Sequence, residues 1–211
     1  MKKGIYPVGL FLTSIIIWLL SYANLPAEIP RQWDFSGQIS NYSSKLLLFL
    51  LLHGVMLGVY LLLLAAPKID PKKTNYAYFR KGYYMMLNSI LTLFFAINMG
   101  LLYVGLGNTL AVHSLVGPLI GMLFIVIGNY MPQIKPNYFI GIRLPWTLAN
   151  EIVWRKTHQL GGKMFFLGGI ILLFLFFLTG IWAGVVIGTA FMIAIVVPII
   201  YSYLIFNRLE N

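Results

Sequence analysis

The stretch "MFFLGGIILLFLFFLTGIWAGVVIGTAFMIAIVVPIIYSYLIF", Met164 to Phe206, contains no charged residue. A membrane-spanning helix needs about 20 apolar residues, because a rise of about 1.5 Å per residue must cross roughly 30 Å of hydrocarbon. The stretch is therefore long enough to span a membrane twice. Gly180, Trp182 and Gly184 lie near its middle and favour a tight turn with an interfacial aromatic anchor. We expect two spans joined by a short connection.

The rest of the chain has the same character. Only 9% of the residues are charged and 60% are hydrophobic, whereas a soluble domain carries about 25% charge. Six segments can span a bilayer: about 4–23, 46–66, 83–105, 113–130, 164–181 and 184–206. The composition predicts an all-α membrane protein, a six-transmembrane helical bundle, and the absence of cysteine is compatible with a bacterial cell (plasma) membrane. No linker divides residues 1–211, so we expect a single membrane domain, with an N-terminal loop-bearing hairpin at about 1–66.

The distribution of Lys and Arg predicts the orientation. With both termini in the cytoplasm, thirteen of the 15 basic residues lie inside and two, Arg31 and Lys45, lie outside. Cytoplasmic loops normally carry such an excess, so the prediction is N-in/C-in. The net charge of +10 gathers in loops without a basic, aromatic-rich arm. This indicates contact with anionic membrane lipids and no direct nucleic-acid binding.

The loop between spans four and five is polar: "GIRLPWTLANEIVWRKTHQLGG", Gly141 to Gly162. Pro145 suits a first helical turn and Gly161-Gly162 suits a helix end, so we expect a cytoplasmic interfacial helix over 145–162. It carries more polar groups than anchoring at a membrane surface requires. Its polar face would either clamp the loop intramolecularly or dock a partner. The candidate platform residues are Asn137, Arg143, Trp146, Thr147, Asn150, Trp154, Thr157 and His158.

The outside loop after span one reads "LPAEIPRQWDFSGQISNYSSK". Pro26 and Pro30 forbid a continuing helix and favour an extended, turn-rich path. Trp33-Asp34 followed by Gly37 predicts a turn in which Asp34 accepts local backbone N–H groups and Gly37 takes a positive φ. Trp33, Asp34 and Gly37 are the candidates for sensing an outside ligand.

The sequence gives little support for a metal site or for an enzyme active site. The chain has no cysteine, and His53, His113 and His158 share no i, i+3 or i+4 spacing. Glu151 and His158 lie two helical turns apart, roughly 10 Å along the axis, which is too far to share an ion without further ligands. The predicted spans contain no Asp or Glu to serve as catalytic acids. We therefore expect no metal, no cofactor and no enzyme, with His53 satisfied between helices.

Two features concern the inside of the bundle. Asn88 and Thr92 share a face of span three, which is typical of interhelical hydrogen bonding, with a transport pathway as the alternative. Small residues recur every fourth position and permit close helix contact. They are Gly54 and Gly58; Gly117 and Gly121; and Gly180, Gly184 and Gly188.

The outside loop and the polar loop both resemble one family. Leu25-Pro26, Ile29-Pro30, Trp33-Asp34, Gly37 and Lys45 resemble a short domain, of unassigned function, that opens many bacterial SdpI-like proteins. Residues about 113–206 are similar to that family's signature region. The matching positions are Gly128-Asn129, Pro132, Asn137, Gly141, Arg143, Pro145-Trp146-Thr147, Asn150, Trp154, Thr157-His158 and Gly161-Gly162.

The resemblance implies a function that the residues alone do not. The family's namesake is an immunity protein against a secreted membrane-active toxin peptide. It is also a receptor that holds a small DNA-binding autorepressor at the membrane. We therefore expect toxin immunity, with a repressor as a further partner. The alternatives are a transporter or permease for a small molecule, lipid or peptide, and a membrane enzyme that uses His158 and Glu151.

Overall fold

The computed structural model describes residues 4–34, 37–110, 112–178 and 180–210, with the side chains of residues 112–114 excepted. Within these ranges six helices are long and apolar enough to cross a membrane: Ile5–Asn24, Lys45–Ile69, Arg80–Gly105, Leu115–Gln133, Glu151–Phe177 and Gly180–Glu210. The predicted all-α membrane bundle of six spans is confirmed. At most 33% of the most apolar stretch of any span is buried within the protein. Most of these apolar side chains are therefore at least partly exposed, which suits a lipid environment.

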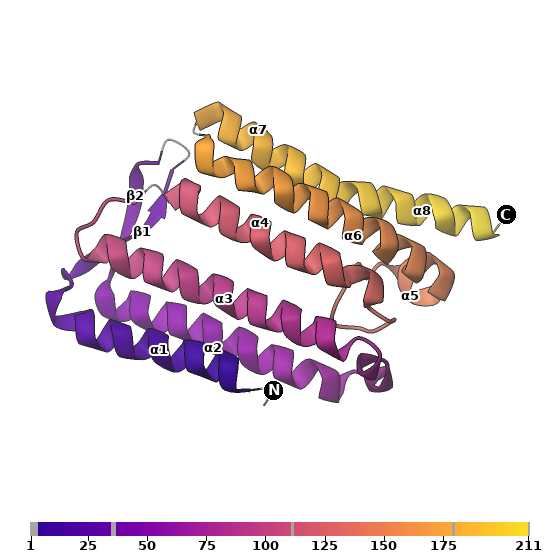
Figure 1. The fold of residues 1–211 in the computed structure, drawn as a ribbon, viewed down its shortest axis with the longest axis horizontal. Helices are drawn as coiled ribbons and strands as arrows, with labels where there is room; N and C mark the ends of the chain where they lie inside the picture. Colours follow the sequence, from indigo (N-terminus) through magenta and orange to yellow (C-terminus); the bar gives the residue numbers. More distant parts are fainter. Residues whose placement is uncertain (1–3, 35–36, 111, 179, 211) are drawn as a thin grey trace.

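The helices run side by side along the long axis (Figure 1). They are α1 (Ile5–Ser21), α2 (Lys45–Ile69), α3 (Arg80–Gly105), α4 (Val112–Tyr130), α5 (Pro145–Ala149), α6 (Glu151–Leu173), α7 (Gly180–Phe191) and α8 (Val197–Glu210). Residues Met192–Val196 form a π-helical segment that joins α7 to α8 into the sixth span. Short 3₁₀ turns occur at Tyr22–Asn24, Lys73–Ala77, Met131–Gln133 and Phe174–Phe177.

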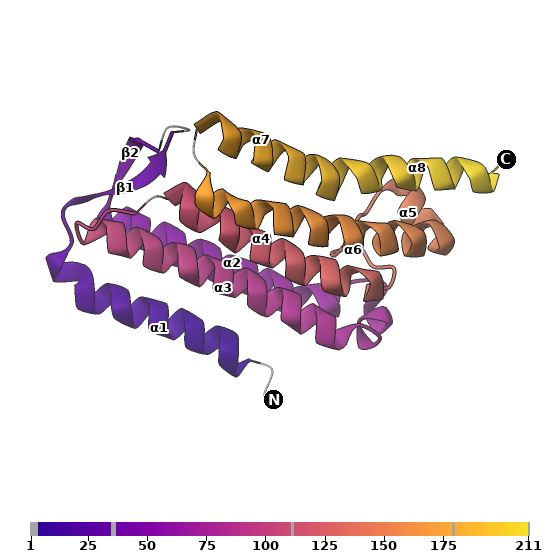
Figure 2. The ribbon, with the colours of Figure 1, turned by 45° about the horizontal axis from the view of Figure 1, so that its top comes forward.

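The two ends of the bundle differ. A β-hairpin of β1 (Glu28–Trp33) and β2 (Ile39–Ser44) lies at one end, the hairpin end. The end of α8 and the loops that join α2 to α3 and α4 to α6 lie at the other end, called here the loop end (Figure 1). The rotated view shows α1 at one edge of the molecule and α7 and α8 at the opposite edge, outside α6 (Figure 2). The sequence predicted an extended path after span one, and the hairpin adds strand pairing to it.

The tightest helix contact joins α4 to α6 and is made by glycines. A Cβ on Gly169 would lie 2.6 Å from the carbonyl oxygen of Gly121, and a Cβ on Gly162 would lie 2.7 Å from that of Gly128. Only glycine permits backbones to approach so closely. The prediction of close contact is therefore confirmed for Gly117 and Gly121, which pack against α6 and the 3₁₀ turn that follows it.

Two predicted glycine contacts are wrong. A Cβ on Gly54, Gly58, Gly184 or Gly188 would meet no atom of the described residues within 4 Å, so none of these four glycines makes a close helix contact there. Gly180 does take a positive φ of 63° where α7 begins, which confirms the break between spans five and six. Spacing alone does not tell which face of a helix has a neighbour.

The predicted helix over 145–162 is also wrong in its bounds. Asn150 is extended (φ −132°, ψ 119°) and separates the five-residue α5 from α6. α6 then continues through Gly161 and Gly162 into the fifth span. The two glycines do not end the helix, because they lie in its interior and give close contact with Met131 and Pro132.

Candidate functional site

The hairpin turn is built as predicted. The Asp34 carboxylate accepts the backbone N–H of Gln38 at 2.9 Å, and the Gly37 N–H donates to the Asp34 carbonyl at 3.0 Å. Gly37 has a φ of 83°, which favours glycine. Asp34 and Gly37 therefore shape the turn that follows Trp33, while Phe35 and Ser36 lie outside the described residues.

The hairpin packs against the helices below it. Ile29 is fully buried and packs with Leu25, Trp18, Leu48 and Leu102 in one apolar cluster. A Cβ added to Gly105, at the end of α3, would lie 3.1–3.3 Å from the side chains of Leu25 and Ile29. The base of the hairpin thus rests directly on the end of α3.

Lys45 has a structural role that the sequence did not indicate. Its ammonium group donates to the carbonyls of Tyr22 and Leu25, at 3.1 Å each, and lies 4.6 Å from the Tyr22 ring centroid. These carbonyls belong to the turn that ends α1, where helical partners are missing. Lys45 thereby joins the end of α1 to the start of α2.

A cavity of about 350 Å³ lies beside β1, between the hairpin and the ends of α3 and α4. Trp33 and the polar side chains of Arg31 and Gln32 form its hairpin wall. Its remaining lining comes from apolar residues that include Leu101 and Leu115. Of the three predicted sensing residues, only Trp33 lines this space.

At the loop end, Asn137 organises the segment between α4 and α5. Its side chain is fully buried and accepts the N–H groups of Phe139 (2.9 Å) and Ile140 (2.7 Å). Its amide nitrogen donates to the carbonyls of Lys135 and Ile140. The Tyr76 hydroxyl lies 3.3 Å from Oδ1 of the same side chain. The Asn137 amide thus makes hydrogen bonds with five polar groups.

Asp70 connects the two loops of this end, and the sequence analysis missed it. Its buried carboxylate accepts the hydroxyl of Tyr76 (2.9 Å) and the backbone N–H groups of Lys72 (2.7 Å) and Tyr138 (2.9 Å). Burial, together with the Asp70 bond, raises the pKa of Tyr76 well above its usual value. A lone acid among the lysines of "APKIDPKK" was the only signal in the sequence.

His158 and Trp154 fasten the same loop to α6. The Trp154 indole donates to the Ile134 carbonyl at 2.8 Å, and its ring stacks on the His158 imidazole with centroids 4.1 Å apart. His158 Nδ1 lies 2.8 Å from the Trp154 carbonyl, and Nε2 lies 3.0 Å from the Ile142 nitrogen. Because a carbonyl accepts and an N–H donates, the ring is a neutral imidazole with its proton on Nδ1.

The other predicted platform residues, except Thr157, also make hydrogen bonds within the protein. Asn150 caps α6 by accepting the N–H groups of Ile152 and Val153, and Thr147 accepts the N–H of Leu144 at 2.8 Å. Trp146 donates to the Ser202 hydroxyl on α8 at 2.8 Å, and Arg143 donates to the Tyr138 carbonyl. Thr157 is buried, and its hydroxyl has no hydrogen-bond partner among the described residues. These contacts form an intramolecular clamp.

An open face remains beside this clamp. A cavity of about 270 Å³ lies between the Met131–Ile134 turn and the first turns of α6. Its rim carries the exposed side chains of Lys135, Glu151, Arg155 and Gln159. Among the described residues, no group of three or more His, Asp or Glu side chains could hold a metal ion.

Comparison with known proteins adds a family to this geometry. Residues 133–202 match the SdpI/YfhL protein family, and residues 9–57 match a domain of unknown function, DUF1648. Immunity protein SdpI of Bacillus subtilis (strain 168) is 27% identical over 211 residues, covering 100% of this chain and 99% of the relative. No solved structure matches. The matched regions contain both strands of the hairpin and the clamp around His158. The chain is therefore a multi-pass membrane protein that is similar to SdpI-like proteins along its whole length.

Proposed function

We propose that this protein gives its cell immunity to a secreted, membrane-active toxin peptide, with the hairpin cavity as the receiving site. The observation that carries the proposal is the 350 Å³ space beneath Trp33, which combines an apolar floor with the Arg31 cation. An amphipathic peptide offers both kinds of contact. Full-length similarity to a protein named for immunity supports the same function.

The proposed orientation places the hairpin outside and both termini in the cytoplasm, within one membrane domain. The basic residues support it, because the connections at the hairpin end hold only Arg31 and Lys45. A secreted peptide would then meet Trp33 before it meets the lipid. Asp34 and Gly37 serve this site indirectly, by holding the turn that orients Trp33.

The test is survival of a sensitive bacterium that expresses variants of the chain and is challenged with culture supernatant containing the killing peptide. Trp33→Ala should lower survival at least about tenfold while the amount of protein in the membrane stays the same. Tyr42→Ala is the matched control, because Tyr42 is an exposed aromatic on β2 that does not line the cavity. Full protection by Trp33→Ala, or equal loss in both variants, would refute the cavity as the site.

For signalling, we propose that the open face of Lys135, Arg155 and Gln159 docks a cytoplasmic repressor. These side chains point to solvent at the cavity rim, whereas His158 and Trp154 are committed to the clamp. Arg155→Ala with Gln159→Ala should abolish induction of a reporter for the repressor's operon and leave survival intact. Lys156→Ala, exposed on the same helix but outside the cavity, is the control. Normal induction in the double variant would contradict this role.

The two alternatives draw less support from the geometry. Both nitrogens of His158 are hydrogen-bonded to backbone groups, so neither is open to act as a base on a substrate. For a transporter, buried Asn98 is a polar group within α3, yet its amide has no hydrogen-bond partner among the described residues, whereas an ion-coupled pathway needs linked polar or charged groups. Energised uptake by vesicles that contain the purified protein would favour transport over immunity by binding.

A further inference from the structure

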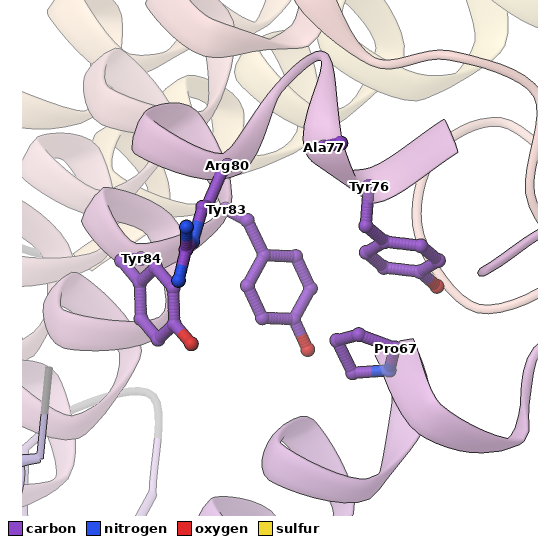
Figure 3. Close-up of a pocket in the computed structure, with 6 residues that line it drawn as sticks. All are labelled: Pro67, Tyr76, Ala77, Arg80, Tyr83 and Tyr84. Atoms are coloured by element: carbon purple, nitrogen blue, oxygen red, sulfur yellow. The ribbon is translucent and has the colours of Figure 1, made fainter. Parts of the chain in front are cut away.

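A separate pocket of about 200 Å³ lies at the loop end, where α2 ends and α3 begins. Figure 3 shows Pro67 on one side and the rings of Tyr76, Tyr83 and Tyr84 around the space, with the Arg80 side chain among them. Since α2 and α3 are membrane spans, the pocket lies at the depth where lipid headgroups meet the protein.

Two of the tyrosines serve as walls. The Tyr76 hydroxyl donates to Asp70. The Tyr83 hydroxyl donates to the carbonyl of Leu63, which has no helical partner because Pro67, four residues later, lacks an N–H. With both hydroxyls engaged within the protein, these two rings contribute apolar surface to the pocket.

Arg80 is the cation of this pocket. Its side chain is exposed, and none of the described Asp and Glu residues forms an ion pair with it in the structure. Its guanidinium group presents several N–H donors in a fork that matches phosphate oxygens. The pocket therefore offers an unpaired guanidinium framed by aromatic rings.

The surroundings are strongly basic. Residues 66–84, from the last turn of α2 to the first turn of α3, hold five basic residues and one acid, Asp70, which gives a net charge of +4. The basic residues are Lys68, Lys72, Lys73, Arg80 and Lys81. Asp70 is buried and already accepts three hydrogen bonds. The field at the pocket thus favours an anion.

An apolar cavity of about 330 Å³ adjoins the pocket through a shared wall, Tyr83. Its lining includes Leu63, Met86, Leu87 and Phe165. A cationic pocket beside an apolar cavity suits a molecule with an anionic head and a hydrocarbon tail. Free phosphate would use only the first of these two spaces.

We propose that this pocket binds an anionic phospholipid, with the phosphate on Arg80 and an acyl chain along the apolar cavity beside Tyr83. The site is distinct from the hairpin cavity and does not depend on toxin binding. Phosphate, whether from a lipid or from solution, is the shared chemistry, and the apolar cavity argues for the lipid.

The experiment uses the full chain, purified and delipidated in a neutral detergent, with bound lipid counted by native mass spectrometry. Phosphatidylglycerol should bind with higher affinity than phosphatidylcholine of the same chain length. Arg80→Gln should weaken phosphatidylglycerol binding about tenfold, the loss expected for a charge-assisted phosphate contact. Lys73→Gln is the control, because Lys73 is an exposed cation of the same connection that does not line the pocket.

The outcomes separate the possible sources of the anion. Equal affinity for the two lipids, or equal loss in Arg80→Gln and Lys73→Gln, would overturn the site. Inorganic phosphate that displaces phosphatidylglycerol at equal concentration would overturn the lipid as occupant. Arg80→Lys tests folding, since it keeps the charge and should retain part of the affinity. If Arg80→Lys and Arg80→Gln bind phosphatidylglycerol as tightly as the unmodified chain, Arg80 has no part in lipid binding.

Discussion

Gly141 lies directly against the imidazole of His158, so closely that a Cβ on Gly141 would overlap Nε2. Gly141 also has a φ of 110°, which disfavours any side chain. The contact lets the next residue, Ile142, donate its N–H to His158. One glycine therefore permits the hydrogen bond that holds the loop to α6.

We expect Gly141→Ala to lower the amount of folded protein in the membrane. Backbone strain of about 1–3 kcal/mol would be added to the displacement of His158. Gly107→Ala is the matched control, because Gly107 has a φ of 91° but its Cβ would meet no atom within 4 Å in the part of the chain that the structure describes. Thermal unfolding in detergent should show a larger loss for Gly141→Ala. Equal losses of thermal stability in the two variants would mean that the contact of Gly141 with His158 adds nothing to the effect of the positive φ.

The contact between α4 and α6 predicts a second pair of variants. Gly169→Ala should destabilise the bundle by several degrees, because its Cβ would lie 2.6 Å from a backbone oxygen that cannot move independently of α4. Gly54→Ala should be neutral or stabilise by about 0.5–1 kcal/mol, since it replaces a helical glycine at an open position. The measurement is the unfolding temperature of each variant. An unchanged unfolding temperature for Gly169→Ala would contradict the close packing of α4 on α6.

Tyr83→Phe tests the carbonyl that Pro67 leaves without a helical partner. Loss of the hydroxyl would leave the Leu63 carbonyl unpaired, at a cost of about 1–3 kcal/mol where it is buried. Tyr78→Phe removes a hydroxyl from a ring that is 75% exposed and should change little. The measurement is the unfolding temperature of each purified variant. No difference between the two would show that the Leu63 carbonyl is satisfied in another way.

Asn98 predicts a variant that gains stability. Both polar atoms of its buried amide lack a hydrogen-bond partner among the described residues. Asn98→Leu has a similar shape and removes two unsatisfied groups, so the unfolding temperature should rise, by about 1–3 kcal/mol in free energy. A marked loss of function with the expected gain in stability would instead assign Asn98 to a transport or signalling role.

Cysteine labelling tests the proposed orientation. Ser36, a natural choice in the hairpin loop, lies outside the described residues, so we select Ser40 on β2 and Thr74 in the α2–α3 connection, both exposed. A membrane-impermeant thiol reagent should label Ser40→Cys in intact cells and Thr74→Cys only after the cells are opened. The chain has no native cysteine, so the background is low. Labelling of Thr74→Cys in intact cells would reverse the topology.

The sequence predicted the spans well, because hydrocarbon thickness imposes one length on every crossing helix. It also predicted the Asp34–Gly37 turn, whose hydrogen bonds are local in sequence. It failed where a residue's role depends on distant neighbours. Gly161-Gly162 looked like a helix end, yet its place is set by contacts with Met131 and Pro132, about 30 residues away.

The polar loop illustrates the same limit. Composition correctly marked Asn137, Trp154 and His158 as unusual in an apolar chain, but their partners are backbone groups that no residue pattern reveals. Asp70 was missed because its importance arises from Tyr76 and Tyr138, which come from two different loops. His113 lies in the first turn of α4, and its side chain is outside the described part of the chain.

The contact of Ile29 with Gly105 has a mechanical consequence. α3 has 26 residues and is about 39 Å long. The hairpin packs against its C-terminal end, and Arg80 lies at its N-terminal end. A peptide that tilts the hairpin must either move Ile29 relative to Gly105 or displace α3 together with the hairpin. If both proposed sites are occupied, a toxin peptide at the hairpin and a phospholipid at Arg80 therefore act on opposite ends of the same helix.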